Sequence, residues 1–506
     1  MNLLDSALDH SPRKTSSRHW SSYQQAIFQA VEEGSQNLLV QAVAGSGKST
    51  TLVEAMEHSQ GRNLFLAFNK SIAMDIAAKA PEQTVKTLNA LGHWQWMQNS
   101  PGSKLEARKV SLIIKRLIGE GEDYKEFGYT LTRLVGLAKN LCFGLDQGPG
   151  SGFKTSFPPT IFQVDPQLFE DLVEAYHFDL PLEQLPRFCE VCSLALYESS
   201  SDWETFDFDD QLYMPALAGW DYPSYSTVFV DECQDLSPIQ HLMLDRLALK
   251  GARIIAVGDR HQAIYGFRGA ATDSMELLKH RFSALELPLS ISYRCDNAII
   301  SEAQIYCPTI LARSDAGPGL VTLQDGEDPA LFNSGLVVCR NNAPLFAAIL
   351  RHYRAKRPCR VLSNFLESFT GFLRGFKTTY SSDLQSKLDL WYHRECESAR
   401  SKGQRGRLAG LEDKYETASL FCRDFQLTAD ILLCIKRLGE GSTGPTFSTI
   451  HKAKGLESEE VYFLRPDLCP SPRAETAEAK QQERNLAYVA ITRAKQKLTY
   501  GNIPRR

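Results

Sequence analysis

The sequence lacks the marks of a membrane or secreted protein. No uninterrupted apolar run is long enough to cross a bilayer. The N-terminal segment is polar and has no apolar core of the kind that secretory signals carry, and we expect residues 1–19 to form a disordered tail. These absences predict an intracellular protein with no membrane partner.

Paired cysteines and a strong net charge are missing as well. The 12 cysteines are scattered, and the one C-x-x-C, Cys189 with Cys192, has no second pair or nearby histidine. We interpret it as two positions on one helical face rather than a zinc site, and scattered cysteines fit a reducing compartment. The net charge is only −4, so a surface for nucleic acid would have to be a local groove.

The chain does have the length and composition of a soluble protein with several domains. Its 506 residues suggest about three or four units. Apolar strands followed by helices recur in two blocks, and mainly helical segments interrupt each block. This pattern predicts an α/β fold with two cores of parallel sheet, each carrying a mainly helical insertion. We expect the first core at 20–92 and 201–284, its insertion at 93–200, the second core at 285–344 and 441–506, and its insertion at 345–440.

One glycine-rich segment points to a nucleotide. The apolar run Leu38–Val40 leads into residues 41–50, Gln-Ala-Val-Ala-Gly-Ser-Gly-Lys-Ser-Thr, which match a P-loop except that Ala42 stands where the general pattern has its first glycine. Small residues let several backbone N–H groups face one phosphate, and the following helix aims its positive end at the same anion. The predicted phosphate contacts are Ala44, Gly45, Ser46, Gly47, Lys48, Ser49 and Thr50.

An acidic cluster, Asp231–Asp235, follows the apolar strand 227–230 and supplies what a P-loop lacks. A buried strand that ends in acids delivers those side chains to the edge of a sheet where ligands bind. We expect Ser49 and Asp231 to hold Mg²⁺ and Glu232 to polarise the attacking water. The two motifs together predict ATP hydrolysis with ATP and Mg²⁺ as cofactors.

A basic cluster in the second helical segment has two interpretations. It consists of Arg351, Arg354, Lys356, Arg357 and Arg360. Such a cluster is usually a solvated face, although the aromatic residues near it also fit nucleic-acid contact. The four phenylalanines that follow lie at spacings of four, three and four, which predicts a helix stripe facing a core. They are Phe365, Phe369, Phe372 and Phe376.

Taken in order, the motifs resemble those of superfamily 1 DNA helicases of the UvrD/Rep type. Within that family the segments 267–270 and 451–455 resemble the F-box DNA helicases, without an F-box segment. The matching segments are Gln24 (Q motif), 42–49 (motif I), 67–70 (Ia), 87–92 (Ib), 206–212, 231–235 (II), 257–270 (III), 292–294 (IV), 449–457 (V) and 483–494 (VI).

The resemblance implies roles for further residues. It implies two RecA-like cores, with Gln262, Arg294 and Arg493 acting beside Lys48, Asp231 and Glu232 in catalysis. Gln24, Tyr293 and Glu457 would complete the nucleotide site. Phe68 could instead be a core aromatic at a strand end. The implied DNA contacts are Phe68, Asn69, Lys70, Thr87, Tyr265, Phe267, Arg268 and His451.

Two positions depart from the family pattern. Phe267 stands where many members have tryptophan, which keeps a stacking face with less contact area. Thr50 stands where an arginine often stacks on adenine, which leaves base stacking to Tyr293.

The resemblance implies an ATP-dependent DNA helicase that moves 3′→5′ on single-stranded DNA and acts at single/double-strand junctions. It would unwind duplexes or displace proteins in DNA repair or recombination, with protein partners in repair or replication that the sequence does not name. Three alternatives stay open: an RNA helicase, a P-loop ATPase or kinase independent of nucleic acid, and a scaffold without enzymatic activity.

Overall fold

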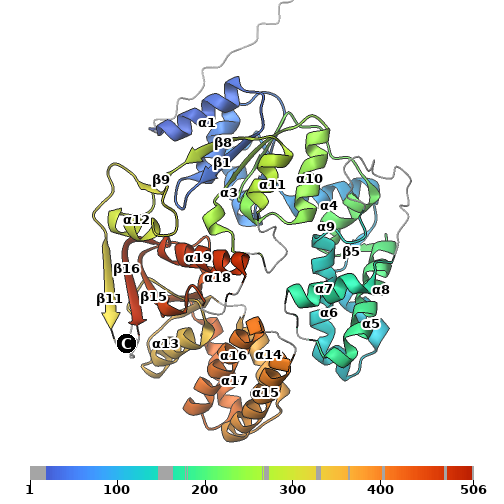
Figure 1. Ribbon diagram of the computed structural model, residues 1–506, viewed down its shortest axis with the longest axis vertical. Helices are drawn as coiled ribbons and strands as arrows, with labels where there is room; N and C mark the ends of the chain where they lie inside the picture. The colour runs from blue at the N-terminus through green and yellow to red at the C-terminus, as the bar shows by residue number, and fades with distance from the viewer. Residues whose placement is uncertain are drawn as a thin grey trace, which may run out of the picture.

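The computed structural model describes residues 19–145, 163–176, 178, 180–264, 266, 273–325, 332–362, 365–401, 405–471, 474 and 476–503. The predicted tail therefore lies outside the described residues except for His19. Two α/β cores and two helical regions make up the molecule (Figure 1). Both large sheets have six strands, all parallel, so the predicted α/β class with two parallel sheets is confirmed.

The first sheet has the strand order β3-β2-β6-β7-β1-β8. Its central strands are almost entirely buried, as expected of a parallel sheet covered on both faces. The apolar side chains of α1, α2 and α3 pack on one face, and those of α4, α10 and α11 pack on the other. The strands are β1 (Leu38–Ala42), β2 (Asn63–Ala67), β3 (Thr84–Thr87), β6 (Thr227–Val230), β7 (Arg253–Gly258) and β8 (Leu285–Leu289). The helices are α1 (Ser22–Glu33), α2 (Lys48–Glu57), α3 (Lys70–Lys79), α4 (Leu88–Asn99), α10 (Pro238–Leu249) and α11 (Ser274–Arg281).

The second sheet has the order β11-β16-β15-β12-β14-β13. Helices α12, α18 and α19 cover one face, and α13 covers the other together with the second insertion. The strands are β11 (Leu320–Asp325), β12 (Leu336–Cys339), β13 (Arg360–Leu362), β14 (Thr446–Thr449), β15 (Ser458–Leu464) and β16 (Ala494–Ile503). The helices are α12 (Asn297–Ala303), α13 (Asn342–Arg354), α18 (Ile450–Ala453) and α19 (Ala477–Ile491). A two-stranded ladder of β9 (Ile291–Ser292) and β10 (Leu311–Ala312) lies on the segment between the sheets.

Three predicted boundaries need correction. The second core was expected to start at residue 285, but β8 pairs with β1 and completes the first sheet. The second insertion was expected to start at residue 345, but α13 and β13 belong to the second core, because β13 pairs with β14. A three-residue strand that begins at Arg360, the last residue of the basic cluster, carries too weak an alternation to be seen in the sequence. The first insertion was expected to start at residue 93, yet α4 runs through that point.

The first insertion has its own apolar cluster around Trp96 and Phe188. Cys189 and Cys192 are both buried in that cluster on α8. None of the described helices is long and apolar enough to cross a membrane. The elements of this region are β4 (Lys104–Leu105), α5 (Lys109–Ile118), α6 (Glu122–Asn140), α7 (Pro166–Ala175), η1 (Leu182–Gln184), α8 (Leu185–Ser201), β5 (Thr205–Phe206) and α9 (Asp210–Ala218).

The second insertion packs on the second core through the predicted phenylalanine stripe. Phe369 is fully buried, and the other three phenylalanines pack against the same cluster, which confirms a core-facing stripe. In the basic cluster, Arg354 pairs with Asp424, and Arg357 Nη1 donates to Asn333 Oδ1 over 2.8 Å. These two arginines are committed to contacts within the chain. The helices are α14 (Phe365–Gly375), α15 (Ser381–Ser401), α16 (Arg405–Asp424) and α17 (Thr428–Glu440).

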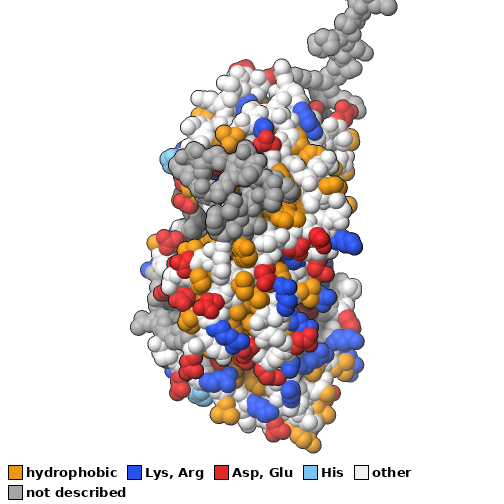
Figure 2. All heavy atoms as spheres, turned by 90° about the vertical axis from the view of Figure 1, so that its right-hand side faces the viewer, with side chains coloured by type: hydrophobic (Ala, Val, Ile, Leu, Met, Phe, Trp, Pro, Cys, Tyr) orange, Lys and Arg blue, Asp and Glu red, His pale blue; other side chains and the backbone are white. Residues whose placement is uncertain are grey.

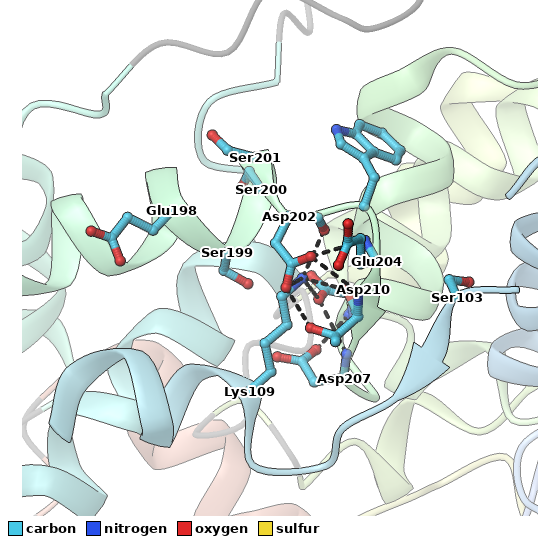
Figure 3. A network of polar contacts seen from close by, with 12 residues as sticks. Ser103, Lys109, Glu198, Ser199, Ser200, Ser201, Asp202, Glu204, Asp207 and Asp210 are labelled. Atoms are coloured by element: carbon cyan, nitrogen blue, oxygen red, sulfur yellow. Dashed lines mark hydrogen bonds and ion pairs between the residues drawn. The ribbon is translucent and has the colours of Figure 1, made fainter. Parts of the chain in front are cut away.

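Two buried lysines fasten the first insertion to the chain that returns to the first core. Lys109 Nζ donates to Asp210 Oδ2 over 2.9 Å and to the Thr205 carbonyl over 2.7 Å. Lys139 Nζ lies 2.7 Å from Asp210 Oδ1 and 2.8 Å from Asp207 Oδ2. Figure 3 shows Lys109 reaching into this group of carboxylates. Removing one partner of a buried pair leaves an uncompensated charge, so the network fixes segment 205–210.

Charges on the surface are mixed. On the face shown in Figure 2, basic and acidic side chains are interspersed. This agrees with the net charge of −4 and with a nucleic-acid surface that is local rather than global.

Candidate functional site

The P-loop joins β1 to α2 with two residues in the left-handed region. Gly45 has φ +72° and Gly47 has φ +78°, conformations that favour glycine. A Cβ on Gly45 would lie 2.5 Å from Cβ of Arg294, whereas a Cβ on Gly47 would meet nothing within 4 Å. The buried Ser46 hydroxyl has no hydrogen-bond partner among the described residues. An open cradle with an unpartnered hydroxyl fits a phosphate.

Three predicted catalytic residues and Ser49, a predicted magnesium ligand, meet at the start of α2. Ser49 Oγ donates to Asp231 Oδ2 over 2.6 Å, and Lys48 Nζ lies 3.3 Å from Glu232 Oε1. Glu232 has φ +53°, a strained conformation for a residue other than glycine, of the kind that gathers at functional sites. The 3-10 turn η2 (Cys233–Asp235) follows directly. The arrangement brings the two predicted magnesium ligands close to the predicted base and its lysine partner.

Burial sets the protonation of this group. It raises the pKa of Asp231, and the neighbouring Glu232 carboxylate raises it further. Burial would also raise the pKa of Glu232, but Lys48 and Lys454 outweigh it and lower that pKa. Burial would lower the pKa of Lys48, but Glu232, Asp259 and Asp231 raise it overall. Glu232 is therefore an ionised base and Lys48 a full cation at neutral pH.

The turn after β7 brings Gln262 to the same region. Within η3 (Arg260–Gln262), Gln262 Nε2 donates to Asp259 Oδ2 over 2.7 Å. Arg493 Nη2 lies 3.4 Å from Gln262 Oε1, although the two residues are 231 positions apart. Arg493 is 1% exposed, and burial and the nearby Arg294 lower its pKa to about 9. Within the described residues Arg493 forms no ion pair with a carboxylate, so this buried guanidinium is suited to an anionic ligand.

Arg294 lies on the segment that connects the two sheets, beside the P-loop. The Tyr293 N–H donates to the Gly45 carbonyl over 2.9 Å, which holds this segment against the loop. Arg294 Nε donates to Glu457 Oε2 over 2.8 Å, and its Nη1 donates to the Thr492 carbonyl over 3.1 Å. The structure thus brings Arg294 and Glu457 together beside the P-loop.

The predicted base contacts form one hydrogen-bonded group. Tyr293 Oη donates to Gln24 Oε1 over 3.3 Å, and Gln24 Nε2 donates to Thr51 Oγ1 over 3.0 Å. Gln24 is buried, the Tyr293 ring is 38% exposed, and Thr50 is half-buried at the start of α2. An exposed ring beside a buried amide is an arrangement that can stack on a base and read its edge.

Three residues of the second core approach the P-loop and its neighbours without having been predicted. Lys454 forms an ion pair with Asp235, and its Nζ donates to the Gln262 carbonyl over 2.7 Å. The Ala44 N–H donates to Tyr488 Oη over 2.9 Å. Asn485 Nδ2 donates to two carbonyls of the turn at η3. Most of these partners are main-chain atoms of distant loops, for which a sequence offers no signal.

Four of the eight predicted DNA contacts lie at the ends of β2 and β3. Phe68 is 41% exposed and so is not a core aromatic. Asn69 and Thr87 act as helix caps, accepting from the Ile72 and Ala90 N–H groups over 2.9 Å and 3.1 Å. Lys70 is exposed at the start of α3, and His451 is half-buried on α18 in the second core. Tyr265, Phe267 and Arg268 lie outside the described residues.

Phe208 is a further aromatic on this side that the sequence analysis did not select. Its ring is 55% exposed, and its carbonyl accepts from Asn89 Nδ2 over 3.0 Å. Asn89 lies two positions after Thr87 on α4. Phe208 follows Asp207, one of the carboxylates shown in Figure 3, so an exposed ring stands on a loop that the buried lysines hold in place.

Two family models match the chain. The UvrD/REP helicase N-terminal domain matches residues 201–283, and the UvrD-like helicase C-terminal domain matches residues 445–502. Both cores of the chain thus carry domains of the UvrD/Rep superfamily 1 helicases. The two matches cover the acidic cluster and the turn after β7 in one core, and the segments that carry Lys454, Asn485 and Arg493 in the other.

Relatives of this UvrD/Rep-type chain include eukaryotic proteins. It is 25% identical over 525 aligned positions to the F-box DNA helicase protein 1 of Schizosaccharomyces pombe, covering 94% of this chain and 57% of that protein. It is 28% identical to the F-box DNA helicase 1 of Gallus gallus, over 49% of this chain and 24% of that protein. A solved Arterivirus nonstructural protein 10 helicase in complex with DNA aligns with a TM-score of 0.34 and 14% identity, over 95% of this chain and 63% of that one.

Proposed function

We propose that the chain is an ATP-driven DNA translocase and helicase that moves 3′→5′ on single-stranded DNA. It couples hydrolysis to duplex unwinding or protein displacement in DNA repair or recombination. The main observation behind this proposal is the hydrogen bond from Arg493 Nη2 to Gln262 Oε1. It joins an arginine of the second core to the turn that follows β7 in the first core. A P-loop ATPase without a moving partner core has no use for that contact.

Each residue at the P-loop has a defined task in this proposal. Ser49 and Asp231 hold the Mg²⁺ ion, which would neutralise phosphate charge. Lys48 holds the outer phosphates, and Glu232 takes a proton from the attacking water. Gln24 and Tyr293 hold the base, and Glu457 completes the nucleotide contacts.

The arginines link hydrolysis to the cleft. Arg294 and Arg493 stabilise negative charge on the γ-phosphate when the cores close around the nucleotide. Closure requires the second core to approach the P-loop, and opening follows loss of the γ-phosphate. Alternating grip on one strand by the two cores then moves the protein along DNA.

A surface at the ends of β2 and β3 contacts the single-stranded DNA. Phe68 and Phe208 offer exposed rings for base stacking, and Lys70 offers a charge for phosphate. His451 contributes from the second core. Tyr265, Phe267 and Arg268 are assigned to the strand by their motif alone.

The proposed 3′→5′ direction of movement rests on the resemblance of two sequence motifs. The segments 257–270 and 483–494 resemble the UvrD branch of the superfamily, whose members move 3′→5′. The relatives named above are DNA helicases, which favours DNA over RNA as the track.

The test is ATP hydrolysis and strand separation on duplexes with a 3′ or a 5′ single-stranded tail, in DNA and in RNA. We expect hydrolysis to be stimulated by single-stranded DNA and unwinding to require a 3′ tail. Unwinding only from a 5′ tail would reverse the polarity, and activity only on RNA would change the track. Hydrolysis that ignores every nucleic acid would support the P-loop ATPase alternative.

A further inference from the structure

Helix α19 contacts the nucleotide loops of the first core through one face. Asn485 Nδ2 donates to the Arg260 carbonyl over 3.1 Å and to the Ala263 carbonyl over 2.9 Å. One turn later, Tyr488 Oη accepts from the Ala44 N–H over 2.9 Å. Positions three apart on a helix share a face. The same helix thus touches the P-loop and the turn that follows β7.

The Asn485 amide is held in one orientation. Gln481 Nε2 donates to Asn485 Oδ1 over 2.9 Å, which leaves the amide NH₂ group facing the two carbonyls. Asn485 is buried. Its two acceptors lie at the start of η3 and just after its end, so one side chain clamps both ends of the turn that carries Gln262.

Tyr488 makes the corresponding contact with the P-loop. Its side chain is fully buried, and its ring centroid lies 5.7 Å from that of His261. Val43, Ala44 and Tyr488 belong to one apolar cluster. Burial raises the pKa of Tyr488 far above its usual range, so the phenol stays neutral and keeps its hydrogen bond.

We propose that Asn485 and Tyr488 are positioning residues through which α19 follows the state of the nucleotide site. The inference rests on the proposed function. Gln262 is hydrogen-bonded to Asp259 and Arg493, and a γ-phosphate would compete for its amide. A displaced η3 would either break the two hydrogen bonds that the Asn485 amide donates or take α19 with it. Leaving the amide of the buried Asn485 without its acceptors is costly, so α19 moves with the turn.

Asn485 and Tyr488 have a different role from the arginines. Arg493 acts on the nucleotide, whereas the hydrogen bonds described for Asn485 and Tyr488 join them to main-chain atoms of the first core. They respond to where the two loops lie, and their substitution leaves every proposed phosphate contact in place. Their loss should therefore spare nucleotide affinity and affect the transmission of movement.

The experiment compares the wild-type protein with Asn485→Ala, Asn485→Asp and Tyr488→Phe. Lys480→Ala, an exposed position on the same helix, is the matched control. Hydrogen exchange of residues 477–491 is measured with and without a saturating non-hydrolysable ATP analogue. Analogue affinity, DNA-stimulated kcat and base pairs opened per ATP are measured on the same preparations.

We expect the analogue to slow exchange in α19 of the wild-type and control proteins but not in the Asn485 variants. Analogue affinity should stay within about twofold, while base pairs opened per ATP fall about tenfold. Tyr488→Phe, which removes only the hydroxyl, should show a smaller loss of the same kind. Asn485→Asp keeps the shape but replaces the donating amide with an acceptor, so an α19 response that does not need the donor would survive in that variant.

Two results overturn the inference: an unchanged α19 response in Asn485→Asp, or a parallel loss of analogue affinity and turnover in all variants. If an Asn485 variant does not fold, Gln481→Ala replaces it, because this exposed substitution only frees the amide to flip. A wild-type protein whose α19 responds to the analogue but whose turnover ignores DNA would refute the proposed function and leave this inference standing.

Discussion

Arg294 Nε and Glu457 Oε2 lie 2.8 Å apart, which joins two predicted nucleotide contacts that are 163 positions apart in the chain. Lys495 also lies 3.0 Å from the Glu457 carboxylate. Burial would raise the pKa of Glu457, but Lys495 and Arg294 outweigh it and lower that pKa. The carboxylate thus stays ionised and fixes the guanidinium of Arg294 at the mouth of the P-loop.

Arg294→Ala should remove an arginine finger. We expect kcat for ATP hydrolysis to fall about 10³-fold or more, with a much smaller change in ADP affinity, because the side chain serves the γ-phosphate. Steady-state kinetics and ADP titration check this. Arg313→Ala is the control, since Arg313 Nη1 donates to the Tyr293 carbonyl on the same segment. Equal losses in both variants would assign Arg294 a structural role.

Glu232→Gln should retain ATP binding and lose hydrolysis, because an amide cannot accept the proton from water. We expect kcat to fall about 10²–10⁴-fold. Lys48→Ala should weaken nucleotide binding as well. Glu459→Gln serves as the control, since Glu459 is an exposed partner of Lys495. Near-normal turnover in Glu232→Gln would remove Glu232 from the role of base.

Gly45→Ala and Gly47→Ala should separate two uses of a left-handed glycine. Both impose about 1–2 kcal/mol of backbone strain. Only the methyl group of Gly45→Ala also meets Arg294 and Ser292, at 2.5 Å and 2.8 Å. We expect a clearly lower melting temperature without nucleotide for Gly45→Ala than for Gly47→Ala, and weakened ATP binding in both. Identical melting temperatures would contradict the close contact of Gly45 with Arg294.

Phe208→Ala should weaken the grip on single-stranded DNA. A stacked base is worth about 1–3 kcal/mol, so affinity should fall about 5- to 150-fold. The ring is 55% exposed, so thermal stability should not change. Fluorescence anisotropy with a labelled oligonucleotide measures the loss, and Leu249→Ala, at a residue 78% exposed on α10, is the control. Unchanged affinity for DNA would show that Phe208 does not stack on a base.

His241 should make the folding stability of the protein decrease at acidic pH. Its Nε2 lies 2.9 Å from Ser274 Oγ, which donates to the Cys233 carbonyl in the acidic cluster. Burial, with a smaller effect from Arg281, lowers the pKa of His241 from 6.5 to about 4. Between these values the unfolded chain binds a proton that the folded chain does not, so stability falls as pH falls.

The loss should approach about 3 kcal/mol by pH 4. Denaturant unfolding of wild type and His241→Gln across this range measures it. The free energy of unfolding of the variant should lack this part of the decrease at acidic pH. If the two proteins gave superimposable profiles of stability against pH, His241 would not be its cause.

The sequence predicted best those parts of the site whose residues are neighbours in the chain. The P-loop and the acidic cluster each carry their chemistry within a few positions. Asn485, Tyr488 and Lys454 escaped prediction because their partners are largely carbonyl and amide groups of another core. Phe208 was not predicted because its residue type alone does not mark it as a DNA contact. Its exposure becomes informative only once the structure shows that buried ion pairs of the neighbouring aspartates hold its loop in place.

Fold boundaries failed for a related reason. Strand β8 contains Pro288 and two exposed positions, so its apolar pattern is too weak to assign it to the first sheet. Strand β13 is three residues long and follows a basic cluster. Pairing with distant strands decides both assignments, and a local pattern does not contain that information.

The apolar cluster that joins Val43 and Ala44 to α12 and α19 also bears on how such proteins can change over time. The base of the P-loop is packed by residues that belong to the other core. A gain of volume at Val43 has to be matched by a loss at Ile299 or Tyr488, because close-packed interiors feel a single methylene. We therefore expect substitutions at this cluster in one core to need matching substitutions in the other. A chimaera that joins the first core of one helicase to the second core of another would keep all its motifs and still lose its fit.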